Sequence, residues 1–351
     1  MSNRLTLFAG AALVLVGITT FASLQADHRN ERHEQPALAF PKLAASGQDL
    51  GKLVISGPSS KTTLVKQADG TWVVEELGNY PAKIDLINRL YLDLSTLSLL
   101  ERRSAKAENQ AAMGLDAPGN GGAGIEIKAL DKSGAELAGI IQGKVKDPSA
   151  NGTPATLFVR RSGEDQAWFA RSNLQASAMP GEWVDKFIMS ILGNRLSLVE
   201  LRPNGPDPVV LRRDKPDSPD INLVDVPKGR KQDSAQVSAL SQALNALTFE
   251  SVKPKADADM TGAALVRYRL FEGPVIDVRV KRADGKTYAA FAAGSKEGMS
   301  DAAMKEVADI NARTSPFVYV LPAYKADVMT PSKEALLQKP EAAAPAKPAK
   351  P

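Results

Sequence analysis

Cysteine is absent from this sequence of 351 residues, and histidine occurs only twice. Without cysteine the chain can form no disulfide framework, thiolate zinc site, iron–sulfur cluster or cysteine nucleophile. An excess of one charge is also absent, because 44 lysine and arginine residues stand against 40 aspartate and glutamate residues. This balance predicts no basic stripe of the kind that binds nucleic acid, so we expect no nucleic-acid partner. The length allows one large domain or two of ordinary size.

The residues that usually carry chemistry are also sparse. His28 and His33 are five positions apart, which does not place them on one helix face, and no histidine remains for a catalytic triad elsewhere. The sequence GNGGAG at 119–124 matches a dinucleotide-binding glycine pattern, but it leads into a predicted strand at Ile125 and not into a helix. We therefore expect a protein that is not an enzyme, with no catalytic, cofactor-binding or metal-binding residues. A serine–lysine pair or two carboxylates that meet only in the fold stay open as alternatives.

One long run of uncharged residues lies near the start of the chain. Residues 5–24, LTLFAGAALVLVGITTFASL, carry no charge, and as a helix they would extend about 30 Å, the thickness of the hydrocarbon core of a bilayer. Because the apolar run of a signal peptide is usually about 7–15 residues long, we predict that residues 1–24 form a retained transmembrane helix, with a cleaved signal peptide as the alternative. No second run of this length follows. We expect a single-pass protein of the inner membrane with the bulk of the chain in the periplasm.

Composition divides the rest of the chain into segments. The predicted segments are a tether (25–47), a first module (48–178), a connecting helix (179–195), a second module (196–330) and a disordered Ala/Pro/Lys tail (331–351). The connecting helix is indicated by four residues that share one face at helical spacing: Trp183, Phe187, Ile188 and Ile191. The tail ends in PEAAAPAKPAKP, a composition with nothing to bury.

The two modules repeat one order of elements. In each module, runs typical of strands precede one helix with apolar residues three and four positions apart, and further strands follow. Three pairs of positions correspond at offsets of 146, 150 and 151 residues: Leu64 with Val210, Leu94 with Leu244, and Gly143 with Gly294. We therefore predict an α+β fold with two similar modules after the transmembrane helix. Each module is a mainly antiparallel sheet with one covering helix, in the order β-β-β-α-β-β-β. The alternative is one continuous α+β domain whose alternation only looks repeated.

Several short motifs follow one another along the chain. They are Asp69-Gly70-Thr71-Trp72, Tyr80-Pro81-Ala82, Glu101-Arg102, Gly114-Leu115-Asp116-Ala117-Pro118 and Trp183-Val184-Asp185-Lys186. Together they resemble the bacterial family catalogued as domain of unknown function 4340. Lys83 stands where that family usually has aspartate. The resemblance implies a membrane-anchored extracytoplasmic protein, often associated with ABC transport systems of the gliding-motility kind, and it supplies no catalytic residues.

These observations lead to two main expectations for function. The first is a non-enzymatic auxiliary or scaffold component of an ABC-type transport system, whose partners are the inner membrane and an ABC-type permease or associated subunits. The alternative is a cell-envelope glycan- or lipid-binding module, with Trp72, Trp168 and Trp183 as candidate binding-face aromatics. A hydrolase is a third reading, and it requires a pocket with convergent polar side chains.

Overall fold

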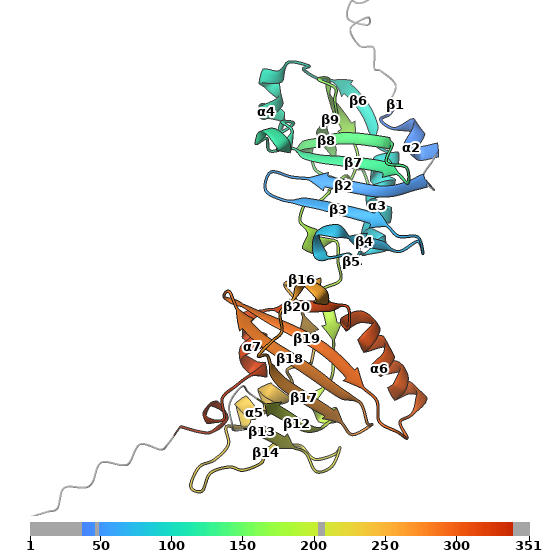
Figure 1. The fold of residues 1–351 in the computed structure, drawn as a ribbon. Helices are drawn as coiled ribbons and strands as arrows, with labels where there is room; N and C mark the ends of the chain where they lie inside the picture. Colours follow the sequence, from blue (N-terminus) through green and yellow to red (C-terminus); the bar gives the residue numbers. More distant parts are fainter. Residues whose placement is uncertain (1–36, 46–48, 203–207, 340–351) are drawn as a thin grey trace, which may run out of the picture. The chain divides into compact units, whose positions relative to one another are not determined.

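The computed structural model describes residues 37–45, 49–202 and 208–339 (Figure 1). Contacts divide the chain into two compact units. The first unit consists of the described residues up to Thr62 together with Ile84–Ala178, and the second consists of Thr63–Lys83 and the described residues from Met179 onward. The predicted membrane helix lies outside the described residues, and within them no helix combines the length and apolarity needed to cross a bilayer.

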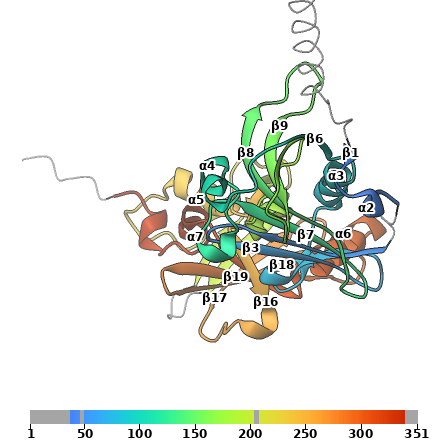
Figure 2. The same ribbon diagram turned by 90° about the horizontal axis from the view of Figure 1, so that it is seen from above.

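A sheet of antiparallel strands is the body of the first unit. Its strands lie in the order β1-β6-β10-β9-β8-β7-β2. They are β1 (Ala37–Leu38), β2 (Leu50–Ser56), β6 (Ser98–Arg102), β7 (Ile125–Asp131), β8 (Glu136–Asp147), β9 (Thr156–Arg161) and β10 (Ala167–Arg171). Alternate residues point into the core, so that Leu53 and Ile55 of β2 are fully buried. β8 and β9 continue beyond their neighbours as a long hairpin (Figure 2).

Two helices cover one face of this sheet. In α3 (Ile84–Ser95), Ile87, Leu90 and Leu94 are buried on one side of the helix. The Tyr91 hydroxyl donates to the Leu43 carbonyl at 3.2 Å, which ties α3 to α2 (Pro41–Ala45). The other helical segments of this unit are η3 (Ala107–Asn109), α4 (Gln110–Met113) and η4 (Pro118–Asn120). Met113 at the end of α4 and Leu115 just after it pack on Ile141 and Ala167 in a smaller core.

A short antiparallel ribbon links the two units along the chain. It consists of β3 (Lys61–Lys66), β4 (Trp72–Val74) and β5 (Tyr80–Pro81), with η2 (Glu75–Leu77) between the last two, and the division between the units falls within β3. The ring of Tyr80 lies 5.3 Å from that of Phe249, 4.8 Å from Phe317 and 6.2 Å from Tyr319, measured between centroids. This aromatic cluster explains why the contacts of residues 63–83 group with the second unit, although the sequence pattern places them in the first module.

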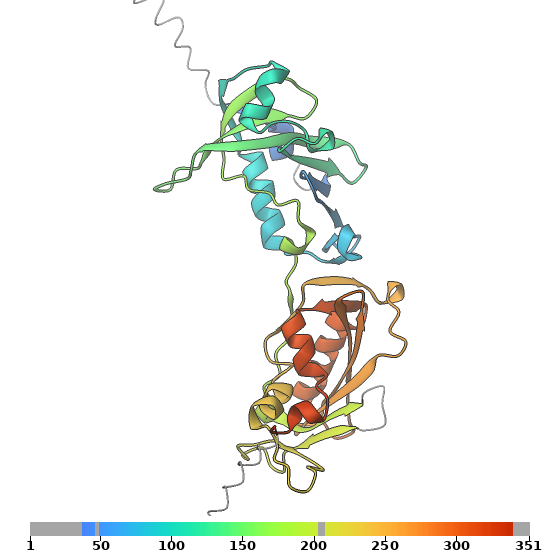
Figure 3. The same ribbon diagram turned by 90° about the vertical axis from the view of Figure 1, so that its left-hand side faces the viewer.

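The second unit contains another antiparallel sheet, in the order β14-β13-β12-β17-β18-β19-β20-β16. Its strands are β12 (Leu196–Arg202), β13 (Val209–Arg212), β14 (Asn222–Leu223), β16 (Ser251–Pro254), β17 (Ala264–Leu270), β18 (Val275–Ala283), β19 (Lys286–Gly294) and β20 (Phe317–Leu321). The helices α5 (Ser234–Ser241), α6 (Asp301–Thr314) and α7 (Ala323–Met329) lie on one face of the sheet (Figure 3). The α+β class with mainly antiparallel sheets is confirmed, but the prediction of one helix for this module is wrong.

The two sheets share one strand order. The strands β2-β7-β8-β9-β10-β6 and β12-β17-β18-β19-β20-β16 are antiparallel throughout, and in both sets the strand at the far edge comes after a helix, α3 or α5. β3 and β4 pair as β13 and β14 do. The predicted match of Gly143 with Gly294 is wrong, because Gly143 lies in β8 and Gly294 ends β19. Because the loops differ in length between the two sheets, strands at the same place in the shared order are not separated by one constant number of residues.

Residues 179–195 do not form the predicted connecting helix. They contain η5 (Pro180–Glu182), β11 (Phe187–Met189), which pairs with β15 (Leu247–Thr248), and η6 (Gly193–Arg195). The Trp183 carbonyl accepts from Lys83 N–H at 2.8 Å, and the Lys186 carbonyl accepts from Phe249 N–H at 3.1 Å. Bonds to residues far along the chain thus take the place of the i→i−4 bonds of a helix.

The predicted tether and tail are each ordered in part. Residues 37–45 of the tether form β1 and α2, with Leu43 fully buried. In the tail, η8 (Glu334–Leu336) buries Leu336 completely, and Gln338 N–H donates to the Lys231 carbonyl at 2.9 Å. The tether and the tail are partly ordered for the same reason: each mainly polar segment contains an apolar residue, Leu43 or Leu336, that is buried in a core. Residues 25–36 and 340–351 lie outside the described residues.

Candidate functional site

A groove of about 380 Å³ lies between β11 and α6 in the second unit. Its apolar surface comes from Phe187, Met189 and Ile191 on the side of the strand, and from Ala302 and Ile310 on the side of the helix. Phe187 is 38% exposed, whereas Met189 and Ile191 are buried. A buried apolar floor beside an exposed aromatic ring is typical of surfaces that bind another molecule.

Local sequence fixes the position of α6, one wall of this groove. The Ser300 hydroxyl caps the helix by accepting from Ala303 N–H at 3.3 Å. Ala303 and Val307 are buried on the side that faces the sheet. The Asn311 side chain accepts from Ala293 N–H at 2.8 Å and donates to the Ala293 carbonyl at 2.7 Å, at the end of β19. The adjacent side of the helix is thereby directed into the groove.

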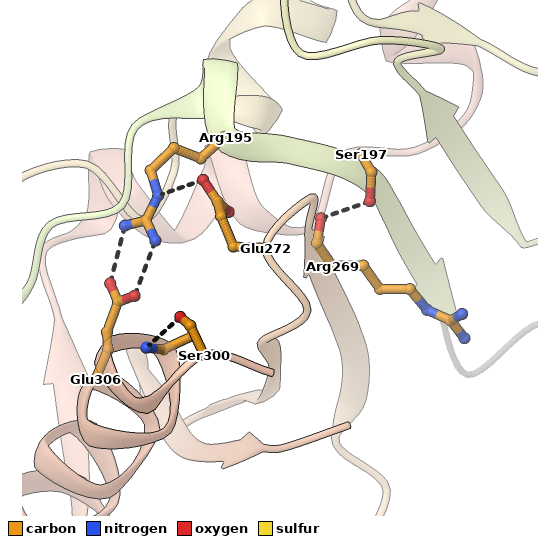
Figure 4. Close-up of polar contacts among 7 residues, drawn as sticks. Arg195, Ser197, Arg269, Glu272, Ser300 and Glu306 are labelled. Atoms are coloured by element: carbon orange, nitrogen blue, oxygen red, sulfur yellow. Dashed lines mark hydrogen bonds and ion pairs between the residues drawn. The ribbon is translucent and has the colours of Figure 1, made fainter. Parts of the chain in front are cut away.

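An arginine just before β12 holds this helix through two-point hydrogen bonding (Figure 4). The Nη1 and Nη2 atoms of Arg195 donate to the two carboxylate oxygens of Glu306 at 2.9 and 2.8 Å, and Nε lies 3.4 Å from Glu272 Oε1. The bonds from Arg195 keep the pKa of Glu306 below its ordinary value, and the bonds to Glu306 raise the pKa of Arg195. Both groups therefore stay charged at neutral pH.

The other polar side chains of the groove are also engaged. Arg313 Nη1 donates to the Ile188 carbonyl at 2.8 Å, and its guanidinium lies 5.5 Å from the centre of the Phe187 ring. Lys305 and Asp309, one turn apart on α6, form an ion pair at 2.6 Å. Hydrogen bonds and ion pairs thus hold these side chains in place.

This arrangement is suited to recognition. The Ser190 hydroxyl donates to Asn245 Oδ1 at 2.9 Å and accepts from Ala246 N–H at 3.2 Å, so both of its polar functions are engaged in a hydrogen-bonded turn. Among residues 37–45, 49–202 and 208–339, no group of three or more histidine, cysteine or acidic side chains is placed to hold a metal ion. Fixed charges around an apolar floor can orient a bound segment, which is what a docking site requires.

The structure does not bring the three candidate tryptophans together on one surface. Trp72 and Trp183 are buried in the second unit, at 6% and 4% exposed, and present no ring to solvent. Trp168 on β10 of the first unit is half-buried, and the Arg102 guanidinium lies 5.2 Å from its ring centre. An aromatic platform made of Trp72 or Trp183 is therefore ruled out by burial, and Trp168 alone keeps that possible role.

Three of the five family motifs, those at 69–72, 80–82 and 183–186, meet in a structural junction beside the groove. Ala82 pairs with Val184 in an isolated bridge, and Ala82 N–H donates to the Trp72 carbonyl at 2.8 Å. Tyr80 from the same motif enters the aromatic cluster. Lys83, the departure from the family pattern, donates its N–H to the Trp183 carbonyl. These motifs hold the ribbon to residues 183–186, from which β11 continues.

Sequence reasoning missed α6 and the Arg195–Glu306 pair. The cap at Ser300 and the spacing of Ala303, Val307 and Ile310 are signals that indicate this helix. The ion pair joins residues 111 positions apart. No spacing rule connects two residues at that separation.

Comparison with protein families matches residues 72–270 to the family described as Domain of unknown function (DUF4340). The match covers more than half of the chain and confirms the resemblance that the motifs indicate. It ends before α6, so the helical wall of the groove lies beyond the matched residues. No curated protein and no solved structure gives a match.

Proposed function

Because the chain belongs to the DUF4340 family, we propose that it is a non-enzymatic, membrane-anchored extracytoplasmic protein that serves as a scaffold or auxiliary component of an ABC-type transport system. Residues 5–24 are its anchor, and the groove between β11 and α6 is its docking site for the permease or an associated subunit. The uncharged run at 5–24 and the family resemblance support the placement at the inner membrane.

The groove is the observation that carries this proposal. Its exposed Phe187 ring, its buried floor and its mutually paired charges suit a protein partner better than a reaction. A reaction needs a group whose proton or electron pair is available, whereas Arg195 and Glu306 are joined at both nitrogens of the guanidinium fork.

Site-specific photo-crosslinking tests the docking site. A photoreactive phenylalanine analogue replaces Phe187 in the full chain, which is co-expressed with tagged components of an ABC-type system from the same cell. The matched control carries the analogue at Leu92, an exposed residue of α3 in the first unit. We expect an adduct with a permease or associated subunit from position 187 only. Equal adducts from both positions, or none with any transport component, contradict the proposal.

The anchor is tested separately by membrane fractionation. We expect the full chain to remain in the membrane fraction through alkaline extraction, and a variant without residues 5–24 to be released. Release of the full chain under the same conditions means that this segment is not a retained anchor.

We further propose that the two sheets are copies of one module. The shared strand order and the equivalent positions of α3 and α5 in the chain support this. An experimental structure in which β2-β7-β8-β9-β10-β6 superposes on β12-β17-β18-β19-β20-β16 with the same connections supports duplication. A superposition that requires different connections contradicts it.

The alternative function, a cell-envelope glycan- or lipid-binding module, now depends on Trp168. Its half-buried ring beside Arg102 is a possible stacking surface. Sedimentation with purified cell wall compares the wild type with Trp168→Ala and with Trp72→Phe as a buried control. Only a loss specific to Trp168→Ala favours this function over the scaffold.

A further inference from the structure

One face of the second sheet carries no helix in the described part of the chain. α5, α6 and α7 lie on the opposite face (Figure 3). Strand register defines the helix-free face through two cross-strand rows. The rows are Arg212–Leu198–Arg269–Val275 and Arg202–Leu265–Arg279. We call these residues, with the neighbouring row Glu200–Arg267–Asp277, the basic face.

Arginine outnumbers acid on the basic face. Arg267 is paired with Asp277 at 2.7 Å, and Arg202 with Glu200 at 2.8 Å. Both acids of the face are used in these pairs. The whole chain has a net charge of only +4, so this face concentrates positive charge that the composition conceals.

Three arginines remain without an acidic partner among the described residues: Arg212, Arg269 and Arg279. All three are exposed, and they come from the three strands β13, β17 and β18. Figure 4 shows the Arg269 side chain extending away from the Arg195–Glu306 pair, while its carbonyl accepts from Ser197 Oγ at 3.1 Å.

Aliphatic side chains lie beside the arginines in these rows. Leu198 lies between Arg212 and Arg269, Leu265 lies between Arg202 and Arg279, and Val275 follows Arg269 at the end of its row. All three are half-buried. Arginine alternating with partly exposed aliphatic groups matches the boundary between the head groups and acyl chains of a bilayer. A soluble polyanion would interact with the arginines alone and would gain no binding energy from the aliphatic side chains.

We propose that the basic face binds the head groups of anionic phospholipids at the surface of the membrane. The proposal rests on the membrane anchor of the proposed function, which keeps the chain near a bilayer. Each arginine within reach of an anionic surface strengthens binding about fivefold, so three together contribute on the order of 100-fold. The attraction depends on salt, because exposed charges are screened.

A fluorescent probe on the face tests this directly, since a chain without cysteine allows a single labelled site. Ala292 is exposed and lies opposite Asp277 in the register of β18 and β19. Ala292→Cys is labelled with an environment-sensitive fluorophore in the full chain. The labelled chain is reconstituted in vesicles of phosphatidylcholine alone, or of an equal mixture with phosphatidylglycerol. A label at Ala312, exposed on α6, is the control.

We expect a blue shift and quenching by spin-labelled lipid for the Ala292 probe in mixed vesicles only. The shift should disappear in high salt and in the variant Arg212→Gln/Arg269→Gln/Arg279→Gln. It should persist in Lys61→Gln/Lys132→Gln/Arg171→Gln, which removes the same charge from exposed positions of the first unit. Circular dichroism verifies that both variants fold.

Several results overturn the proposal. The first is an equal blue shift in both kinds of vesicle, and the second is a blue shift that persists in Arg212→Gln/Arg269→Gln/Arg279→Gln. The third is an equal loss of the shift in that variant and in Lys61→Gln/Lys132→Gln/Arg171→Gln, which indicates a general effect of charge. Displacement of the face-specific signal by an acidic protein or by DNA at concentrations that leave the vesicles intact assigns the face to that partner instead. Co-sedimentation of the full chain with vesicles of pure phosphatidylcholine measures insertion of residues 5–24 alone. If these residues do not insert, binding of the chain to the mixed vesicles still tests whether the basic face recognises anionic phospholipids.

Discussion

The pair between Arg195 and Glu306 should stabilise the second unit, because it ties α6 to the start of β12. The informative changes are Glu306→Gln, which removes the charge and keeps the shape, and Arg195→Gln. Both are made singly and together. A double-mutant cycle then isolates the interaction between the two side chains from the separate effects of each change.

The expected size of this interaction follows from its geometry and exposure. Two charge-assisted hydrogen bonds of 2.9 and 2.8 Å form a fork, but the side chains of Arg195 and Glu306 are 30% and 31% exposed, so water weakens their attraction. We expect a coupling of about 1–2 kcal/mol. Glu272, 3.4 Å from Nε, leaves Arg195 a second partner when Glu306 is lost, which keeps the cost below that of an orphaned buried charge.

The effect should also depend on pH. Hydrogen bonds from Arg195 lower the pKa of Glu306 in the folded protein. A carboxylate of this kind contributes stability above its unfolded pKa of about 4.3 and loses it as the pH falls through the folded value. The difference in free energy of unfolding between wild type and Glu306→Gln should therefore be full at neutral pH and should shrink in acid.

Urea unfolding of the second unit, followed by circular dichroism at neutral and acid pH, measures both quantities. The matched control is the exposed pair Lys305–Asp309 on the same helix, for which the cycle should give about 0.3–0.5 kcal/mol. A coupling for Arg195 and Glu306 no larger than that of the control refutes the reasoning. So does a stability difference that is unchanged in acid.

Three further substitutions test the packing, each by its urea midpoint. Tyr80→Ala should lower the free energy of unfolding by about 3–5 kcal/mol, because it removes a ring from the aromatic cluster. The control Tyr324→Ala, at a residue 64% exposed, should change it by less than about 0.5 kcal/mol. Equal effects of the two substitutions contradict the role of the cluster. Gly124→Ala should cost about 1–3 kcal/mol, since the added methyl would lie 2.7 Å from the Asp116 carbonyl oxygen, and a neutral result means that this loop is not tightly packed. Leu336→Ala should cost about 2–5 kcal/mol if residues 331–339 belong to the second unit, and an unchanged midpoint excludes that.

The elements whose apolar residues follow a regular period were predictable from the sequence. Ile87, Leu90 and Leu94 indicate α3, and alternating residues such as Leu53 and Ile55 indicate β2, because one buried face imposes the period of the element. The same period misled at 179–195. There Phe187 and Ile191 have helical spacing, but the backbone is extended and bonds to β15.

The groove could not be predicted, because it is made of segments that meet only after folding. Phe187 and Ile310 are far apart in the chain, and Arg195 reaches Glu306 across 111 positions. Local signals indicate a helix at Ser300, but which face it buries is decided by the sheet on which it packs. The burial of Trp72 and Trp183 was hidden for the same reason, since aromatic residues serve both as core and as binding surface.

The sequence alone determined the family, the class of fold and the exclusion of cysteine chemistry, because these depend on composition and on short motifs. Tertiary structure alone decided where charge accumulates. Arg212, Arg269 and Arg279 are spread through a chain whose charges nearly balance, and they share one face because alternate residues of neighbouring strands point to the same side of a sheet.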